Sequence, residues 1–300
     1  MDETGRKARI TSISFTQRPL DEFIGILDEE GKHGCDLILL PEACTGNDVE
    51  VPENRAVGRI SEIAAKYGVY IVFPIYRKSE TAERVNSSML IGRKGEICGI
   101  YDKVYPFWSE FELDPPCAIG RDAPVFETDF GKIGLAICFD ANFPEVFRRL
   151  SLGGAEAVLW SSAYSAGMSL QAHAINYNYM IVTSTLNSDC IVYDITGQEI
   201  YYQKKPRGEP LVNRLTLDLD RCIFHENYNW DKRAKLLKDY AGKIESDVWL
   251  ERESWFTLKS IAPKISAREI AAKYGMEELA AYKNRSLAEI DKMRGFGFKN

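Results

Sequence analysis

The sequence contains little histidine. Three histidines are present among 300 residues, at positions 33, 173 and 225, and they lie far apart. None of them stands in a spacing such as H-E-x-x-H, in which two imidazoles on one helix face bind a metal ion. The sequence therefore predicts no metal site, and it implies no other cofactor.

Long apolar runs and an excess of basic residues are also lacking. The longest apolar-rich stretches, at residues 10–15, 69–75 and 133–139, are far shorter than the ~20 residues needed to cross a bilayer. The 38 basic residues are outnumbered by 44 acidic ones, giving a net charge of −6, which disfavours a nucleic-acid surface over the whole chain. We therefore expect neither a membrane nor a nucleic acid as partner.

Features of secreted proteins are missing as well. The first seven residues lead directly into a strand-like segment and lack the apolar centre of a signal peptide. The seven cysteines are odd in number and none belongs to a C-x-x-C pair, which favours reduced thiols. Both observations predict a cytoplasmic protein.

The chain does contain an alternation of short β-branched runs and helix-period segments, from residue 8 to about 217. This alternation, together with glycine-containing hairpin turns, predicts mixed sheets covered by helices within one domain. Helices are expected at residues 20–30, 57–67, 144–152 and 171–178. Strands are expected at residues 8–15, 37–40, 69–76, 85–91, 97–101, 124–128, 132–138, 157–160, 180–185, 190–193 and 199–202.

The character of the sequence changes beyond residue 220, where charged helical stretches alternate with aromatic residues. We divide the chain into a domain of residues 1–260 and a helical C-terminal extension of residues 261–300. The extension is expected to pack on the protein or to contact another subunit. A DNA-binding role is the alternative, but it has weak support, because the extension carries eight basic and five acidic residues, a net charge of only +3.

Three reactive side chains each follow an apolar strand. Glu42 comes after the run D-L-I-L-L-P, Lys103 after G-I-Y-D, and Cys138 after I-G-L-A-I. The carboxyl ends of strands in α/β sheets are where ligands bind. Taken singly, each residue has a plainer interpretation: a solvated loop glutamate, a solvent-facing lysine and a buried core thiol.

The order of these three segments, with F-P-E following C-F-D, resembles the nitrilase superfamily of carbon–nitrogen hydrolases. The resemblance covers roughly residues 8–217 and includes the segments V-N-S-S at 85–88, K-G-E-I at 94–97, F-G-K-I-G at 130–134, R-L-S-L-G-G-A-E-A-V-L-W at 149–160 and A-H-A-I-N at 172–176. It implies the four-layer α-β-β-α sandwich of that superfamily and assembly into homo-oligomers. It also implies that Glu42, Lys103 and Cys138 form a catalytic triad.

The chemistry of this set can also be argued from the side chains. Hydrolysis of an amide needs a nucleophile, a proton carrier and donors for the oxyanion. Because no histidine follows a predicted strand, a carboxylate must carry the proton, and Glu42 is the candidate. The Lys103 ammonium is expected to favour the Cys138 thiolate and to bind the oxyanion, with the Phe139 backbone N–H as second donor.

Further candidates come from comparison with the superfamily, whose members commonly carry a second glutamate after the lysine. Glu110, seven residues beyond Lys103, is preferred here over Glu112, and a solvated acidic loop is the plainer alternative. Tyr164 is expected to shape the pocket or simply to pack. Asp140, two residues after Cys138, resembles the amidase and carbamoylase members.

The sequence thus predicts a hydrolase that cleaves a non-peptide carbon–nitrogen bond of a small amide or N-carbamoyl substrate through a cysteine thioester. Ammonia or an amine would be released. Two alternatives remain open: a nitrilase that acts on a C≡N group with the same triad, and a catalytically silent member used for binding or assembly.

Overall fold

A computed structural model describes residues 4–50 and 55–295 of the chain. Two compact units are present, one formed by Ala8–Leu217 and the other by Asp218–Asn300 together with the first seven residues. The predicted boundary at residue 260 does not coincide with this division. By contrast, the larger unit coincides with the stretch over which the sequence resembles the nitrilase superfamily.

The larger unit contains two β-sheets. The first consists of β1 (Lys7–Ser14), β2 (Leu37–Leu39), β3 (Val49–Glu50), β4 (Tyr70–Arg77), β5 (Val85–Ile91), β6 (Ile97–Asp102) and β13 (Leu211–Asp218). Its strand order is β13-β1-β2-β4-β5-β6, with β3 paired to β4. The second consists of β7 (Val125–Glu127), β8 (Lys132–Ile137), β9 (Ala157–Ser162), β10 (Met180–Thr185), β11 (Asp189–Tyr193) and β12 (Glu199–Lys204), in the order β12-β11-β10-β9-β8-β7.

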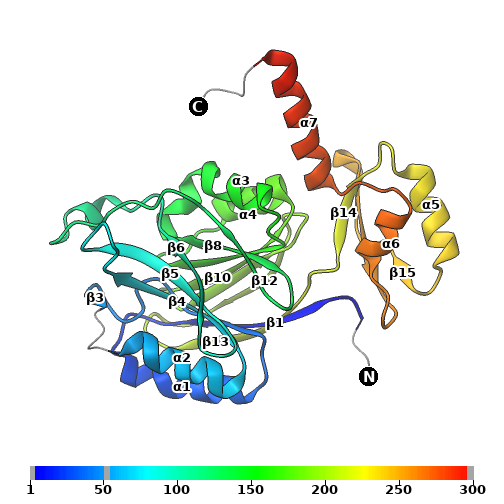
Figure 1. The fold of residues 1–300 in the computed structure, drawn as a ribbon. Coiled ribbons are helices and arrows are strands. Elements are labelled where there is room, and N and C mark those ends of the chain that lie inside the picture. The colour runs from blue at the N-terminus through cyan, green and yellow to red at the C-terminus, as the bar shows by residue number, and fades with distance from the viewer. Residues whose placement is uncertain (1–3, 51–54, 296–300) are drawn as a thin grey trace. The chain divides into compact units, whose positions relative to one another are not determined.

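Helices cover the outer side of each sheet. The helices are α1 (Leu20–Lys32), α2 (Ala56–Tyr67), α3 (Pro144–Leu152) and α4 (Met168–Tyr177). Figure 1 shows α1 and α2 beside the sheet of β4 and β5, and α3 and α4 on the opposite side, beside the sheet of β8 and β10. The order of layers is therefore α-β-β-α, the predicted sandwich.

The sheets face each other across small polar side chains as well as apolar ones. Ser12 and Ser14 of β1 donate hydrogen bonds to the carbonyls of Thr183 and Asp189, at 2.7 and 2.8 Å. Ser184 of β10 donates in return to the carbonyl of Ile13 at 2.7 Å. These residues are buried, so each hydroxyl needs a partner inside the protein. The bonds therefore hold the two sheets in one register.

The helix α2 illustrates how local sequence sets the element boundaries. Its apolar residues Ile60 and Ile63 are buried against the first sheet, as helical periodicity requires. Gly68 ends the helix with φ +62° and donates its N–H to the carbonyl of Ala64, a conformation that glycine adopts without strain.

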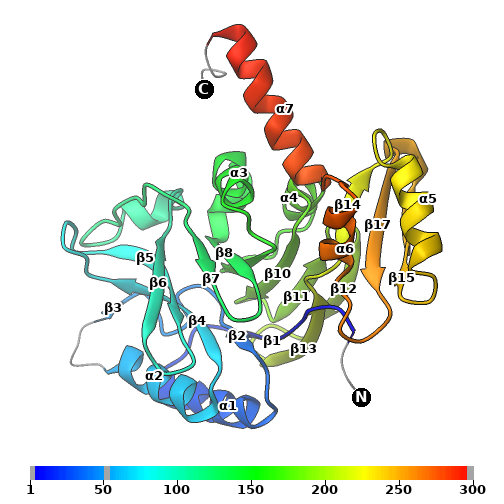
Figure 2. The same cartoon turned by 45° about the vertical axis from the view of Figure 1, so that its right-hand side comes forward.

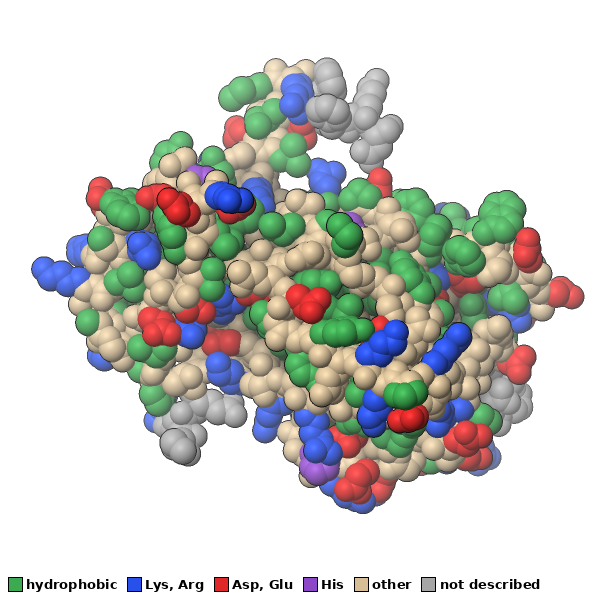
Figure 3. All heavy atoms as spheres, turned by 180° about the vertical axis from the view of Figure 1, so that it is seen from behind, with side chains coloured by type: hydrophobic (Ala, Val, Ile, Leu, Met, Phe, Trp, Pro, Cys, Tyr) green, Lys and Arg blue, Asp and Glu red, His purple; other side chains and the backbone are tan. Residues whose placement is uncertain are grey.

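The outer face of the α1–α2 pair is charged. Figure 3 shows basic and acidic side chains interleaved over these helices. Asp28 of α1 accepts from Lys66 of α2 at 2.6 Å, and Asp21 pairs with Arg59. Such exposed pairs contribute little stability each. Within residues 4–50 and 55–295, no helix is both long enough and apolar enough to pass through a membrane.

The second unit has its own small sheet and core. Its elements are β14 (Cys222–His225), α5 (Trp230–Asp239), β15 (Ile244–Glu245), β16 (Trp249–Leu250), β17 (Trp255–Ser260), α6 (Ala267–Lys273) and α7 (Leu279–Arg294). The strand order is β14-β17-β15, with β16 paired to β17, and α5 and α6 flank this sheet (Figure 2).

The core of this unit explains why the division does not fall at residue 260. Phe256 and Leu258 of β17 share one buried cluster with Ala267 and Ile270 of α6, so elements on both sides of residue 260 fold together. Asp220 adds a polar link, because its carboxylate accepts the backbone N–H of Ala267 at 2.6 Å. Helices do occur after residue 260, but they belong to a mixed α/β unit that begins at residue 218.

Candidate active site

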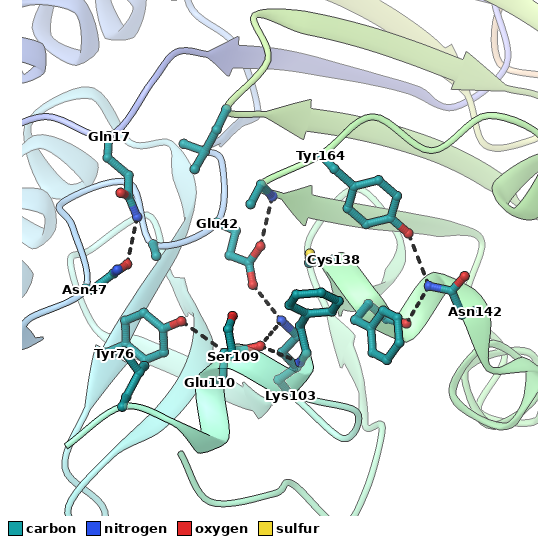
Figure 4. Close-up of a pocket in the computed structure, with 16 residues that line it drawn as sticks. Gln17, Glu42, Asn47, Tyr76, Lys103, Ser109, Glu110, Cys138, Asn142 and Tyr164 are labelled. Carbon is teal, nitrogen blue, oxygen red and sulfur yellow. Dashed lines mark hydrogen bonds and ion pairs between the residues drawn. The ribbon is translucent and has the colours of Figure 1, made fainter. Parts of the chain in front are cut away.

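The ends of four elements bring the predicted residues together in the larger unit. Glu42 follows β2, Lys103 follows β6, Cys138 follows β8, and Glu110 lies on the short helix Trp108–Phe111. Figure 4 shows their side chains converging on one pocket. All four are buried.

Lys103 is held between two carboxylates. Its Nζ lies 2.7 Å from Glu42 Oε1 and 2.6 Å from Glu110 Oε2, and its side chain is only 1% exposed. Burial by itself would lower the pKa of Lys103, but the charges of Glu42 and the other nearby acidic groups hold it well above its usual value. The ammonium is therefore charged at neutral pH.

Asn86, on β5, connects the two glutamates. Its side-chain amide donates to Glu42 Oε1 and to Glu110 Oε1, both at 2.8 Å. Its backbone carbonyl accepts the N–H of Lys103 at 2.9 Å. Asn86 is fully buried. Its side chain fixes the separation of the two glutamates, and its backbone holds the end of the strand that carries Lys103.

The remaining carboxylate oxygens also have donors. Glu42 Oε2 accepts the backbone N–H of Ala163 at 2.8 Å. Glu110 accepts the Tyr76 hydroxyl at 3.1 Å and the backbone N–H of Phe107 at 2.7 Å. Buried carboxylates are stable only with such partners, and the network leaves each of them in one orientation.

Cys138 has a left-handed backbone conformation, with φ +47°, at the junction of β8 and the short helix Cys138–Asn142. Its side chain lies at the pocket and is nearly buried. Burial, and after it the charge of Glu42, raise the pKa of the thiol to about 12, although Lys103 lowers it. The expected effect of Lys103 is thus correct in direction, but the net shift is upward and the thiol is protonated at neutral pH.

Asp140 ties the segment that carries Cys138 to the segment that carries Lys103. Its carboxylate accepts the Tyr101 hydroxyl at 2.7 Å, the Ile137 N–H at 2.9 Å and the Tyr105 N–H at 3.0 Å. These donors come from the end of β8 and from the chain around Lys103. Burial raises the pKa of Asp140 to about 6, although all three hydrogen bonds lower it.

The other predicted residues are placed as follows. Glu112 is exposed and accepts from the Trp108 indole N–H at 3.1 Å, so Glu110 and not Glu112 meets Lys103. Tyr164 lines the pocket, and its hydroxyl accepts from Asn142 Nδ2 at 3.3 Å. The ring of Phe139 also lines the pocket and packs edge-to-face on Phe107 and Phe143, with centroid distances of 5.2 and 5.4 Å.

The pocket has a volume of about 660 Å³. Its lining is Gln17, Glu42, Ala43, Asn47, Tyr76, Lys103, Phe107, Ser109, Glu110, Leu113, Cys138, Phe139, Asn142, Ala163, Tyr164 and Leu186. Among the residues that the structure describes, no three His, Cys, Asp or Glu side chains cluster as metal ligands would.

Comparison with known proteins agrees with this architecture. The family model described as carbon–nitrogen hydrolase matches residues 21–195, more than half of the chain. The chain belongs to the carbon–nitrogen hydrolase family. The matched residues lie within the larger unit and include Glu42, Lys103, Glu110 and Cys138.

Two relatives of this family member illustrate the match. A protein described as a probable nitrilase from Schizosaccharomyces pombe is 36% identical over 152 residues, which cover 45% of this chain and 55% of that protein. The deaminated glutathione amidase of a Synechocystis strain is 30% identical over 179 residues, covering 52% of this chain and 66% of that protein. The chain thus matches between about half and two thirds of the length of these relatives.

A solved structure supports the fold. The amidase of Nesterenkonia AN1, described as belonging to the nitrilase superfamily, has a TM-score of 0.61 with 21% sequence identity, and the match covers 80% of this chain and 99% of that one. The family member described here therefore has the nitrilase-type sandwich that the sequence predicts.

Proposed function

We propose that this family member hydrolyses a non-peptide carbon–nitrogen bond, in an amide or an N-carbamoyl group, through a thioester on Cys138. The observation that carries the proposal is the buried Lys103 ammonium, held at 2.7 and 2.6 Å by two glutamates beside a cysteine in one pocket. A solvated loop residue or a core thiol has no need of such an arrangement.

The first half of the reaction forms the thioester. The thiol is protonated at neutral pH, because its pKa is about 12, so its proton must leave as the sulfur attacks the carbonyl carbon. Glu42 accepts that proton and passes it to the leaving nitrogen. The carbon–nitrogen bond breaks, ammonia or an amine departs, and the acyl group remains on Cys138.

The second half restores the enzyme. Glu42 removes a proton from water, and the hydroxide adds to the thioester carbonyl. The carbon–sulfur bond then breaks, the sulfur regains a proton, and a carboxylic or carbamic acid leaves. Lys103 and the backbone N–H of Phe139 bind the oxyanion in both halves, and Glu110 and Asn86 keep Lys103 and Glu42 in position.

A nitrilase activity is the second candidate. It is favoured by the name of the Schizosaccharomyces pombe relative. The same three side chains would add the thiol to a C≡N carbon and form a thioimidate. One water would then release ammonia and leave the same thioester, and a second water would release the acid.

The test is ammonia release from a panel of primary amides, N-carbamoyl amines and nitriles. Cys138→Ala should abolish release, whereas Cys98→Ala, which removes an exposed thiol outside the pocket, should not. In the wild-type protein, intact-mass spectrometry after rapid acid quench should find an acyl adduct on Cys138. Turnover that survives in the Cys138→Ala variant would refute the assignment, and the active substrate class would separate amidase from nitrilase. Silence toward the whole panel, with no adduct, would favour a catalytically silent member.

A further inference from the structure

The pocket contains few charged groups. Of its lining residues, only Glu42, Lys103 and Glu110 belong to the charged types, and both glutamates are paired with Lys103. Among the described residues, no arginine and no second lysine reaches the pocket. The charges present add up to −1, from two carboxylates and one ammonium.

An anionic group on the acyl side of the substrate would have no partner in this pocket. It would lose its bound water and meet no free cation, because Glu42 and Glu110 already pair with Lys103. Burial of an ion without a partner is costly, so such a substrate would bind poorly.

An ammonium tail would also lack a partner. Glu42 accepts hydrogen bonds from Lys103, Asn86 and the backbone N–H of Ala163. Glu110 accepts four, from Lys103, Asn86, Tyr76 and the Phe107 backbone N–H. Neither carboxylate is left for a cation at the far end of the substrate.

The rest of the lining suits an uncharged group. Aromatic and aliphatic side chains form its walls: Tyr76, Phe107, Leu113, Phe139, Tyr164 and Leu186. Neutral amides add polar atoms: Gln17 donates to Asn47 at 3.0 Å, and Asn142 donates to Tyr164. Figure 4 shows these two pairs on opposite sides of Glu42 and Cys138. The volume of about 660 Å³ is in the range of sites for molecules well beyond acetamide in size.

We infer that the site selects amide or N-carbamoyl substrates with an uncharged, mainly apolar substituent of several carbon atoms, whose far end carries at most a neutral polar group. This inference rests on the proposed function and names the substrate class for it. The amide groups of Gln17, Asn47 and Asn142 are the specificity-determining groups that would contact the far end.

A length-matched series tests the inference. The three probes are hexanamide, its terminal carboxylate analogue adipamate and its terminal ammonium analogue 6-aminohexanamide. We expect kcat/KM from ammonia release at pH 7.5 to be about 30-fold or more higher for hexanamide than for either charged probe, because a buried unpaired ion loses its hydration. Hydrolysis of a charged probe at a rate equal to or above that of hexanamide would overturn the inference and leave the hydrolase intact.

A variant at the pocket rim provides the matched control. Asn47 is exposed, so Asn47→Arg adds a cation without burying it. The ratio of kcat/KM for adipamate to that for hexanamide should rise about tenfold and fall back in high salt. Gln203→Arg, which adds the same charge at an exposed position of β12 outside the pocket, should leave this ratio unchanged. An unchanged ratio in Asn47→Arg would also count against the inference. Silence of all three probes and of the whole panel of amides, N-carbamoyl amines and nitriles, with no acyl mass on Cys138, would instead refute the proposed function.

Discussion

Replacing Lys103 with methionine should expose the energetic cost of the buried charge network. Lys103→Met keeps the side-chain length but leaves Glu42 and Glu110 buried without their cation. Loss of one partner from a buried ion pair costs about 3–5 kcal/mol. With a Tm change of about 2–4 °C per kcal/mol in a domain of this size, the melting temperature should fall by about 6–20 °C.

A double variant separates charge imbalance from loss of packing. Lys103→Met with Glu110→Gln removes one of the two uncompensated carboxylates while keeping its shape. It should recover about 1–3 kcal/mol of the free energy of unfolding relative to Lys103→Met, measured by urea denaturation at pH 8. Neither variant should release ammonia, because both lack the ammonium that the proposed mechanism uses as an oxyanion donor.

The raised pKa of Lys103 determines how its contribution to stability depends on pH. The pKa of Lys103 is held well above its usual value, so the stability it contributes is complete at neutral pH and is lost only as the pH rises through that raised pKa. A double variant no more stable than Lys103→Met would refute this electrostatic account.

Three further outcomes are expected. Because burial raises the pKa of Asp140 to about 6, its contribution to stability is lost as the pH rises from about 4 through 6. Asp140→Asn should therefore remove a decline of about 3 kcal/mol from urea-denaturation measurements across that interval, and an identical decline in both proteins would contradict the argument. Asn86→Ala deletes two hydrogen bonds to buried carboxylates. It should lower the free energy of unfolding by about 3 kcal/mol and lower kcat more than it changes KM. A kcat within twofold of wild type would count against Asn86 as a positioning residue. Truncation after Ser260 removes α6 from its shared core, so limited proteolysis should digest residues 218–260, whereas truncation after Glu278 should leave them protected.

The sequence allowed the strand-end residues to be recognised because each stands where an apolar run stops. Glu42, Lys103 and Cys138 all follow strands, and the structure brings their side chains into one pocket. Asn86 and Tyr76 had no such signal for a role in the site, because both lie within strands. They are paired across β4 and β5, and only the closed sandwich reveals which of their neighbours are acidic.

Two other features depended on tertiary structure. The raised pKa of Cys138 follows from its burial, which cannot be predicted from the neighbouring residues in the sequence. In the sheet of the second unit, β15 and β16 could not be predicted because they have two residues each, too short for a period-two pattern, and gain their order from pairing with β17. The number of sheets in the larger unit could not be predicted either, because non-local pairing decides which strands join the same sheet.

The protonated state of the Cys138 thiol has a consequence for chemical durability. Peroxide and alkylating reagents react with the thiolate, and the sulfenic, sulfinic and sulfonic acids follow from that first attack. A thiol whose pKa is about 12 presents almost no thiolate to them between turnovers. In the proposed mechanism, the bound substrate and Glu42 together would remove the proton from the thiol. Cys138 should therefore stay reduced in aerated buffer without added reductant.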